Sequence, residues 1–203
     1  MLLTICNDVE LACSASVIEH LEDTLQDGEA LIFFYCDFRN ERSTNTAEVM
    51  RSLLSQLLQQ LHDHAVESTG LIDDLEKEGT LIINDIVLLA RYISRAAGHF
   101  SHRLLCAIDA LDECNDLEEL LDALKQLKLG GIRLFVTSRP LQVFRDGLSG
   151  LPSISMDTMN FEVASDISLH VESELDSHRR LRILETSLKN EICLMLCRKA
   201  DGM

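Results

Sequence analysis

The chain has 203 residues, of which 46% are hydrophobic and 26% are charged, so it can form one domain with a sizeable core and is not disordered as a whole. Its formal net charge of −16 disfavours nucleic acids and anionic membranes as partners, because binding to either needs clustered Lys and Arg. No apolar stretch approaches the roughly 20 residues that span a bilayer, so we expect no membrane segment.

The first half of the chain alternates between helical and strand-like patterns. Apolar residues at helical spacing predict a helix over 12–25, and the continuous apolar run at 31–38 predicts a strand buried on both faces. An amphipathic leucine pattern predicts a second helix over 45–62, with Ser43 and Thr44 as candidate N-caps.

The middle of the chain begins with a polar stretch at 64–79 and continues as strands separated by helices. The expected elements are a helix at 81–97, a buried strand at 104–109, a helix at 117–127 and a buried strand at 132–137. Strands joined by helices of this length indicate βαβ crossovers, so the sequence predicts an α/β fold with a parallel sheet.

The pattern after the third strand is weaker. Residues 153–156 are a candidate fourth strand, and helices are expected at 163–175 and 180–198. The densest basic group is interpreted as the solvated face of a helix, and it consists of Arg179, Arg180 and Arg182.

The cysteines favour a reducing compartment. There are seven, an odd number without regular spacing, which is not typical of a disulfide framework. The short apolar segment at 1–6 has no basic run before it and is a poor secretory signal. We therefore expect a cytoplasmic protein whose thiols are mostly buried as small hydrophobic side chains.

Acidic residues gather where the second predicted strand ends. The segment LLCAIDALDEC places Asp109 at the end of the strand, with Asp112 and Glu113 in the turn beyond it. Ligands of parallel sheets bind at this edge, where carboxylates can hold Mg²⁺ or orient an attacking water. Acids in this position also cap the following helix, as Asp116 can, so both interpretations stay open.

Arg139 follows the third predicted strand in the segment IRLFVTSRP. An arginine at this edge of a sheet can contact the γ-phosphate of a nucleotide. It can equally form a structural ion pair with Asp109 or Asp112. The residues alone do not decide between these two roles.

Taken together, LLCAIDALDEC and RLFVTSRP resemble the Walker B and sensor regions of the NACHT-type P-loop NTPases. The similarity is closest to fungal NACHT proteins and to the nephrocystin-like N-terminal module, and it extends over about residues 11–203 through SVIEHL, FFYCDFRN, RSLLSQLLQQL and RKADGM. The resemblance implies a three-layer parallel sheet of the P-loop NTPase type. It also implies a signal-transduction switch controlled by bound ATP or GTP with Mg²⁺.

Site residues carried over by position are implied by this resemblance. Asp109 would bind the cofactor by holding Mg²⁺ through water, and Arg139 would sense the γ-phosphate. Asp112 and Glu113 would be the catalytic acids.

The phosphate-binding loop is the point of departure from the family. That loop reads G-x-x-x-x-G-K-S/T, whereas residues 1–15 contain neither Gly nor Lys. A loop without glycine does not readily form a nest of amide donors, and Asp8 and Glu10 repel phosphate. We therefore expect a sheet that is incomplete at its first strand, weak or absent nucleotide binding, and no hydrolysis.

The expected organisation has a degenerate or unrelated lead at 1–10, a partial NACHT-like core at 11–160 and a truncated helical extension at 161–203. The expected function is a partial NACHT-like signalling module with defective nucleotide binding. One alternative is a degenerate scaffold whose unpaired sheet edge binds a protein partner or a second copy. Another is a truncated gene product without independent activity.

Overall fold

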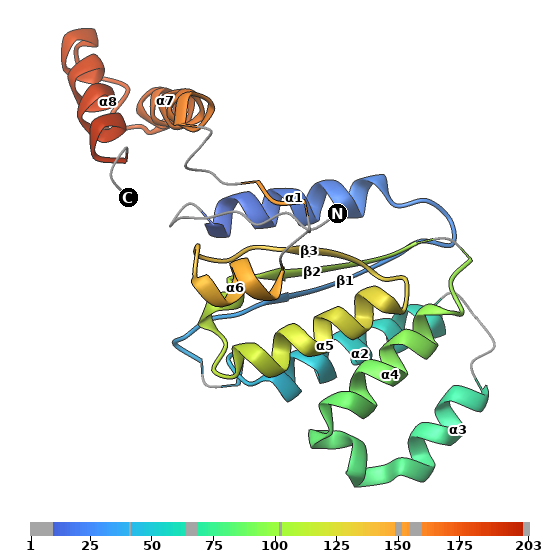
Figure 1. Ribbon diagram of the computed structural model, residues 1–203. Helices are drawn as coiled ribbons and strands as arrows, with labels where there is room; N and C mark the ends of the chain where they lie inside the picture. Colours follow the sequence, from blue (N-terminus) through green and yellow to red (C-terminus); the bar gives the residue numbers. More distant parts are fainter. Residues whose placement is uncertain are drawn as a thin grey trace. The chain divides into compact units, whose positions relative to one another are not determined.

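The computed structural model describes residues 10–40, 42–63, 69–101, 103–148, 152–154 and 160–200. The chain divides into two units, with the boundary after Ser153. The first unit holds the sheet and most of the helices, and the second holds two helices (Figure 1). The lead at 1–9 lies outside the described residues, so the expected loss of the first strand and the domain limits stay predictions.

The first unit is built on a parallel sheet, as predicted. Its described strands lie in the order β1-β2-β3 and are β1 (Ala30–Tyr35), β2 (Leu104–Asp109) and β3 (Arg133–Val136). In register, Tyr35 lies beside Asp109 and Ile108 lies beside Val136. The carboxyl ends of the strands therefore meet at one edge, and β1 ends three residues earlier than the predicted 31–38 because its pairing with β2 stops at Asp109.

Helices cover both faces of this sheet (Figure 1). One face packs against α2 (Thr46–Asp63), α4 (Ile86–Ala97) and α5 (Leu117–Leu129). The other face packs against α1 (Glu10–Thr24). The remaining helical elements of this unit are α3 (Thr69–Glu78), the 3-10 turns at Gly79–Asn84 and Leu111–Glu113, and α6 (Gln142–Gly147).

The two faces of the sheet carry cores of different size. Alternate strand residues point to opposite faces, so Ile32 and Cys106 enter the large core beneath α2, α4 and α5, while Leu31 and Ala107 face α1. The large core includes Leu53 and Leu57, which are one turn apart on α2 and fully buried. Each buried leucine contributes about 2 kcal/mol, so this face supplies most of the hydrophobic stabilisation.

Several predicted boundaries in the first unit are wrong. The predicted helix at 81–97 begins at Ile86, because the Asp85 side chain accepts a hydrogen bond from the Leu88 amide at 2.9 Å and caps it there. The cap of α2 is Asn45, which accepts from the Glu48 amide at 3.1 Å, and not Ser43 or Thr44.

Two helices were not expected, and a helix cap is missing. The polar stretch at 64–79 contains α3, whose Leu71 is buried, and α6 buries Phe144. Asp116 precedes α5 in the N-cap position, but its side chain makes no capping hydrogen bond.

The second unit contains α7 (Asn160–Ser177) and α8 (Thr186–Ala200). The predicted helix at 180–198 therefore starts six residues later, at Thr186. Arg179, Arg180 and Arg182 are exposed, as predicted, but they lie in turns and not on a helix. Ser153 and Ile154 belong to no strand, and the rest of the candidate strand at 153–156 lies outside the described residues.

Within the part of the chain that the structure describes, every helix is too short or too polar to cross a bilayer.

Candidate functional site at the carboxyl edge of the sheet

Asp109 ends β2 in a buried position and is held by Thr137, which directly follows β3. Its side chain is 1% exposed, and its Oδ1 accepts a hydrogen bond of 2.6 Å from the hydroxyl of Thr137. The same hydroxyl oxygen accepts the Ala110 amide at 2.9 Å. Thr137 thus connects the Asp109 carboxylate to the backbone of the turn that follows β2. The sequence did not identify this neutral partner.

The backbone turns sharply directly after Asp109. Ala110 has φ of 53°, in the left-handed region that residues with a Cβ rarely adopt. The turn is held by the Leu111 amide, which donates to the Thr137 carbonyl at 2.9 Å. Such strain persists only where surrounding contacts fix the backbone, and here it directs Asp112 and Glu113 toward neighbouring loops.

Asp112 and Arg139 are brought together by this turn. Asp112 Oδ1 accepts the Arg139 backbone amide at 2.9 Å, and its Oδ2 lies 3.4 Å from Arg139 Nε. The Asp112 side chain is 5% exposed, whereas that of Arg139 is 53% exposed. The structure therefore shows the ion pair with Asp112, and the contact of Arg139 with a γ-phosphate stays a prediction.

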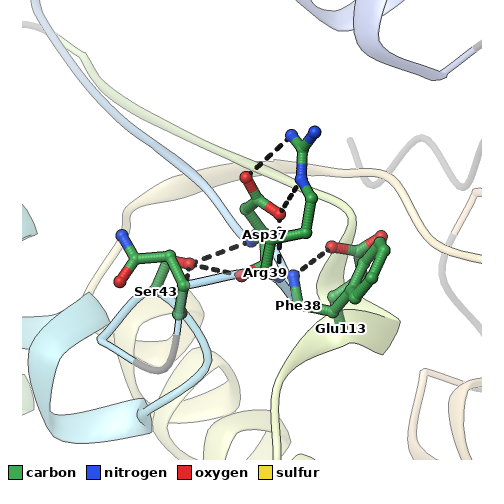
Figure 2. A network of polar contacts seen from close by, with 6 residues as sticks. Asp37, Phe38, Arg39, Ser43 and Glu113 are labelled. Atoms are coloured by element: carbon green, nitrogen blue, oxygen red, sulfur yellow. Dashed lines mark hydrogen bonds and ion pairs between the residues drawn. The ribbon is translucent and has the colours of Figure 1, made fainter.

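Glu113 contacts the loop that follows β1. Figure 2 shows its carboxylate turned toward the backbone of Phe38, whose amide donates to Glu113 Oε2 at 2.7 Å. In the same loop the guanidinium of Arg39 binds both carboxylate oxygens of Asp37, at 2.8 and 2.9 Å (Figure 2). These hydrogen bonds from Arg39 lower the pKa of Asp37 below its ordinary value.

Further contacts join the loop after β1 to the turn after β2. Asn115 donates to Thr44 twice, from its amide to the carbonyl and from its side chain to the hydroxyl, both at 2.9 Å. Cys36 and Cys114 are buried, and their sulfur atoms lie 3.2 Å apart. The sequence placed Thr44 as a cap and the cysteines as buried thiols. The burial of the two cysteines is confirmed. The approach of their sulfur atoms was not predicted, because it depends on which strands are neighbours in the sheet.

A protein-family model described as Nephrocystin 3, N-terminal matches residues 12–139. The chain belongs to this family. No curated protein and no solved structure gives a significant match. The nephrocystin match runs from α1 to the end of the β3 turn, so it contains Asp109, Asp112, Glu113 and Arg139, whereas α7 and α8 lie outside it.

In this nephrocystin-type domain the acids are held by donors of the protein, and their role in Mg²⁺ and nucleotide binding stays a prediction. Asp112 and Glu113 already accept main-chain amides from neighbouring loops, and Asp109 accepts the Thr137 hydroxyl. Among the described residues, no three His, Cys, Asp or Glu side chains are placed to hold a metal ion together. The Ser138 hydroxyl is buried without a hydrogen-bond partner in the described part of the chain, but it is a neutral donor and supplies no charge.

Proposed function

We propose that the chain is a NACHT-like signalling module of the nephrocystin type whose acidic residues hold three loops together. It binds ATP or GTP weakly or not at all and does not hydrolyse either. The observation that carries the proposal is that Asp112 and Glu113, at the family's catalytic positions, each accept a backbone amide from another loop.

The energetics of these hydrogen bonds support a structural role. A carboxylate that swings away to bind Mg²⁺ or water loses the hydrogen bond from its amide, and a hydrogen bond to a charged group contributes about 1.5–3 kcal/mol. Asp112 is the more shielded of the two acids, with 5% of its side chain exposed. Residues 1–15 also contain neither the Gly nor the Lys that would offset this loss by binding the phosphates.

A titration of the full chain with a fluorescent ATP analogue and with its GTP counterpart, each with Mg²⁺, tests the proposal. We expect no saturable binding in the micromolar range and no release of phosphate. D109N is the matched variant, because it removes the charge and retains the shape and an acceptor for Thr137. Micromolar binding to the wild type that D109N abolishes would overturn the proposal.

A second candidate function, binding of a protein partner or a second copy, is favoured by exposed apolar groups in the second unit. Leu194, Met195 and Leu196 are consecutive on α8 and are 60%, 55% and 46% exposed. Consecutive residues point in directions about 100° apart, so this helix presents apolar groups around much of its circumference. Exposed apolar groups of this kind mark interaction surfaces.

An unpaired strand edge favours the same function. Among the described residues β3 pairs with β2 alone, which leaves its other edge without a partner strand.

Light scattering after size exclusion tests self-association over a range of concentrations. We expect a concentration-dependent mass that M195K lowers, while E191K, at an exposed polar position of the same helix, leaves it unchanged. A monomer at every concentration would remove self-association from this candidate.

A further inference from the structure

Two cysteines far apart in the sequence meet at the carboxyl edge of the sheet. Cys36 directly follows β1 and Cys114 directly follows Glu113, and they are 78 positions apart in the chain. Their sulfur atoms are 3.2 Å apart, and the residues are 6% and 5% exposed. Two thiols at this distance are close enough to be oxidised to a disulfide.

We propose that Cys36 and Cys114 form a redox-modification site, a reversible disulfide that locks the loop following β1 to the turn following β2. The oxidant is a two-electron oxidant of small size, such as hydrogen peroxide. The proposal goes beyond the question of nucleotide binding and does not depend on its answer.

The backbone holds both thiols in place for this reaction. The Cys36 amide donates to the Asp109 carbonyl at 3.1 Å, which fixes the start of one loop to the end of β2. The Cys114 amide donates to the Leu111 carbonyl at 3.3 Å, which fixes the other sulfur within its turn. The sulfur atoms must approach by only about 1 Å to reach disulfide bonding distance. Rotation of the side chains supplies a movement of that size.

The reaction balances with peroxide as the only other reactant. One thiolate attacks peroxide, which breaks the O–O bond, forms a sulfenic acid and releases the first water after proton transfer. The second thiol then attacks that sulfur, forms the S–S bond and expels the second water. The two thiols lose two electrons and two protons, and a later dithiol reductant restores them.

The environment makes this site slow to oxidise. The hydrogen bond to Cys114 and burial both raise the pKa of the Cys36 thiol, so the thiolate that attacks peroxide is scarce at neutral pH. We therefore expect oxidation to speed up as the pH rises, and to respond to sustained oxidant. Cys36 and Cys114 have each other as a contact partner, which distinguishes them from Cys106. Cys106 is fully buried in β2, and this burial raises the pKa of its thiol to about 12.

The lock would act on the loops that carry the acids. The Phe38 amide, bonded to Glu113, lies two residues after Cys36, and the Asn115 amide, bonded to Thr44, lies directly after Cys114. A covalent bond between the two loops suppresses the local opening that exposes these amides to solvent.

Peroxide treatment of the reduced full chain, followed by thiol counting and non-reducing peptide mapping, tests the proposal. We expect a peptide linking Cys36 to Cys114 that disappears after reduction. C36S and C114S should each abolish this linked peptide, and the matched control C106S should retain it. Loss of thiols without this link, a link between other cysteines in its place, or no reaction under peroxide that oxidises glutathione would overturn the proposal.

Hydrogen exchange of the wild type needs no substitution and tests the lock itself. We expect the amides of Phe38 and Asn115 to exchange at least about tenfold more slowly in the oxidised form. The Leu88 amide, at the cap of α4, serves as the internal control and should be unchanged. Equal exchange of the Phe38 and Asn115 amides in both forms would contradict the locking role.

Discussion

Two acids at the carboxyl ends of neighbouring strands are held in opposite ways: Asp109 is the last residue of β2, and Asp37 lies two residues after β1. Asp109 is buried and its Oδ1 accepts a neutral hydroxyl, whereas Asp37 has 36% of its side chain exposed and pairs with the solvated guanidinium of Arg39. A hydrogen bond to a buried carboxylate contributes more to stability, because water does not replace the donor there. The exposed pair is screened by solvent and contributes little to stability.

The comparison of Asp109 with Asp37 shows that the position of an acid at the carboxyl edge of a sheet does not by itself make the acid a metal ligand. Asp109, Asp112 and Glu113 are all engaged by donors of the protein, and two of those donors are backbone amides. In this domain the acids connect three loops, and the substitutions below test how strongly each connection holds.

The largest effect is expected for T137V. The substitution retains the shape of the side chain but removes the donor to Asp109 and the acceptor of the Ala110 amide. Both groups are shielded from water, so we expect the free energy of unfolding to fall by about 3 kcal/mol. Urea denaturation followed by circular dichroism measures it.

T137S is the control for this substitution, because it retains the hydroxyl and removes only a methyl group. We expect it to lose less than about half of the T137V effect. If T137S and T137V are equally destabilising, packing and not the hydrogen bonds holds Asp109, and the contrast with Asp37 fails.

A smaller effect is expected for D112A, and a still smaller one for R139A. D112A removes the charged acceptor of the Arg139 amide, and we expect a loss of about 1–2 kcal/mol. R139A retains that amide and removes a half-exposed ion pair with Asp112, so its loss should stay below about 0.5 kcal/mol. The same denaturation experiment compares the two, and a larger effect of R139A would mean that the side chain, not the backbone, holds Asp112.

A110G should change stability in the opposite direction. Glycine relieves the left-handed strain at φ of 53°, and this gain exceeds the added freedom of the unfolded chain, so we expect a rise of about 0.5–1 kcal/mol. A110V should destabilise the fold, because a branched side chain increases the strain. Ala110 is 7% exposed, so a fall in the melting temperature of A110G would show that packing of its buried methyl group outweighs the backbone strain.

The smallest effect concerns the exposed pair. R39A should leave the melting temperature at pH 7 unchanged and raise the pKa of Asp37 toward its ordinary value, as measured by NMR titration. The pKa of Asp37 is lower in the folded state than in the unfolded state. The ion pair therefore stabilises the fold above the unfolded-state pKa of about 3.9, and this stabilisation is lost as the pH falls through the folded-state pKa. R42A, at an exposed position of the same loop, should leave the pKa of Asp37 unchanged.

The sheet could be predicted from the sequence because its strands are short, continuous apolar runs. The run at 104–109 is the strand β2 without any change of boundary, and its central position explains why it is apolar on both faces. The helix α3 was hidden by its many charges, although Leu71 and Leu75 are spaced one turn apart and Leu71 is buried.

The site was predicted only as a location. The residues named from the sequence do gather at one edge, because parallel strands end together. The contact between Asp112 and Arg139 was one of the alternatives left open from the sequence. The contact of Glu113 with Phe38 could not be predicted, because it depends on the turn that Ala110 imposes. The meeting of Cys36 and Cys114 likewise depends on strand order and not on spacing in the sequence.

The sign of the stability change in E113A tests the structural role of the acids most directly. An acid maintained for catalysis is often held at the expense of stability, so its removal leaves the fold equally or more stable. We predict the opposite, a fall of about 1 kcal/mol, because the Phe38 amide loses its acceptor. E119A, at an exposed position in the first turn of α5, is the control. A rise in stability, or a fall no larger than that of E119A, would contradict this account.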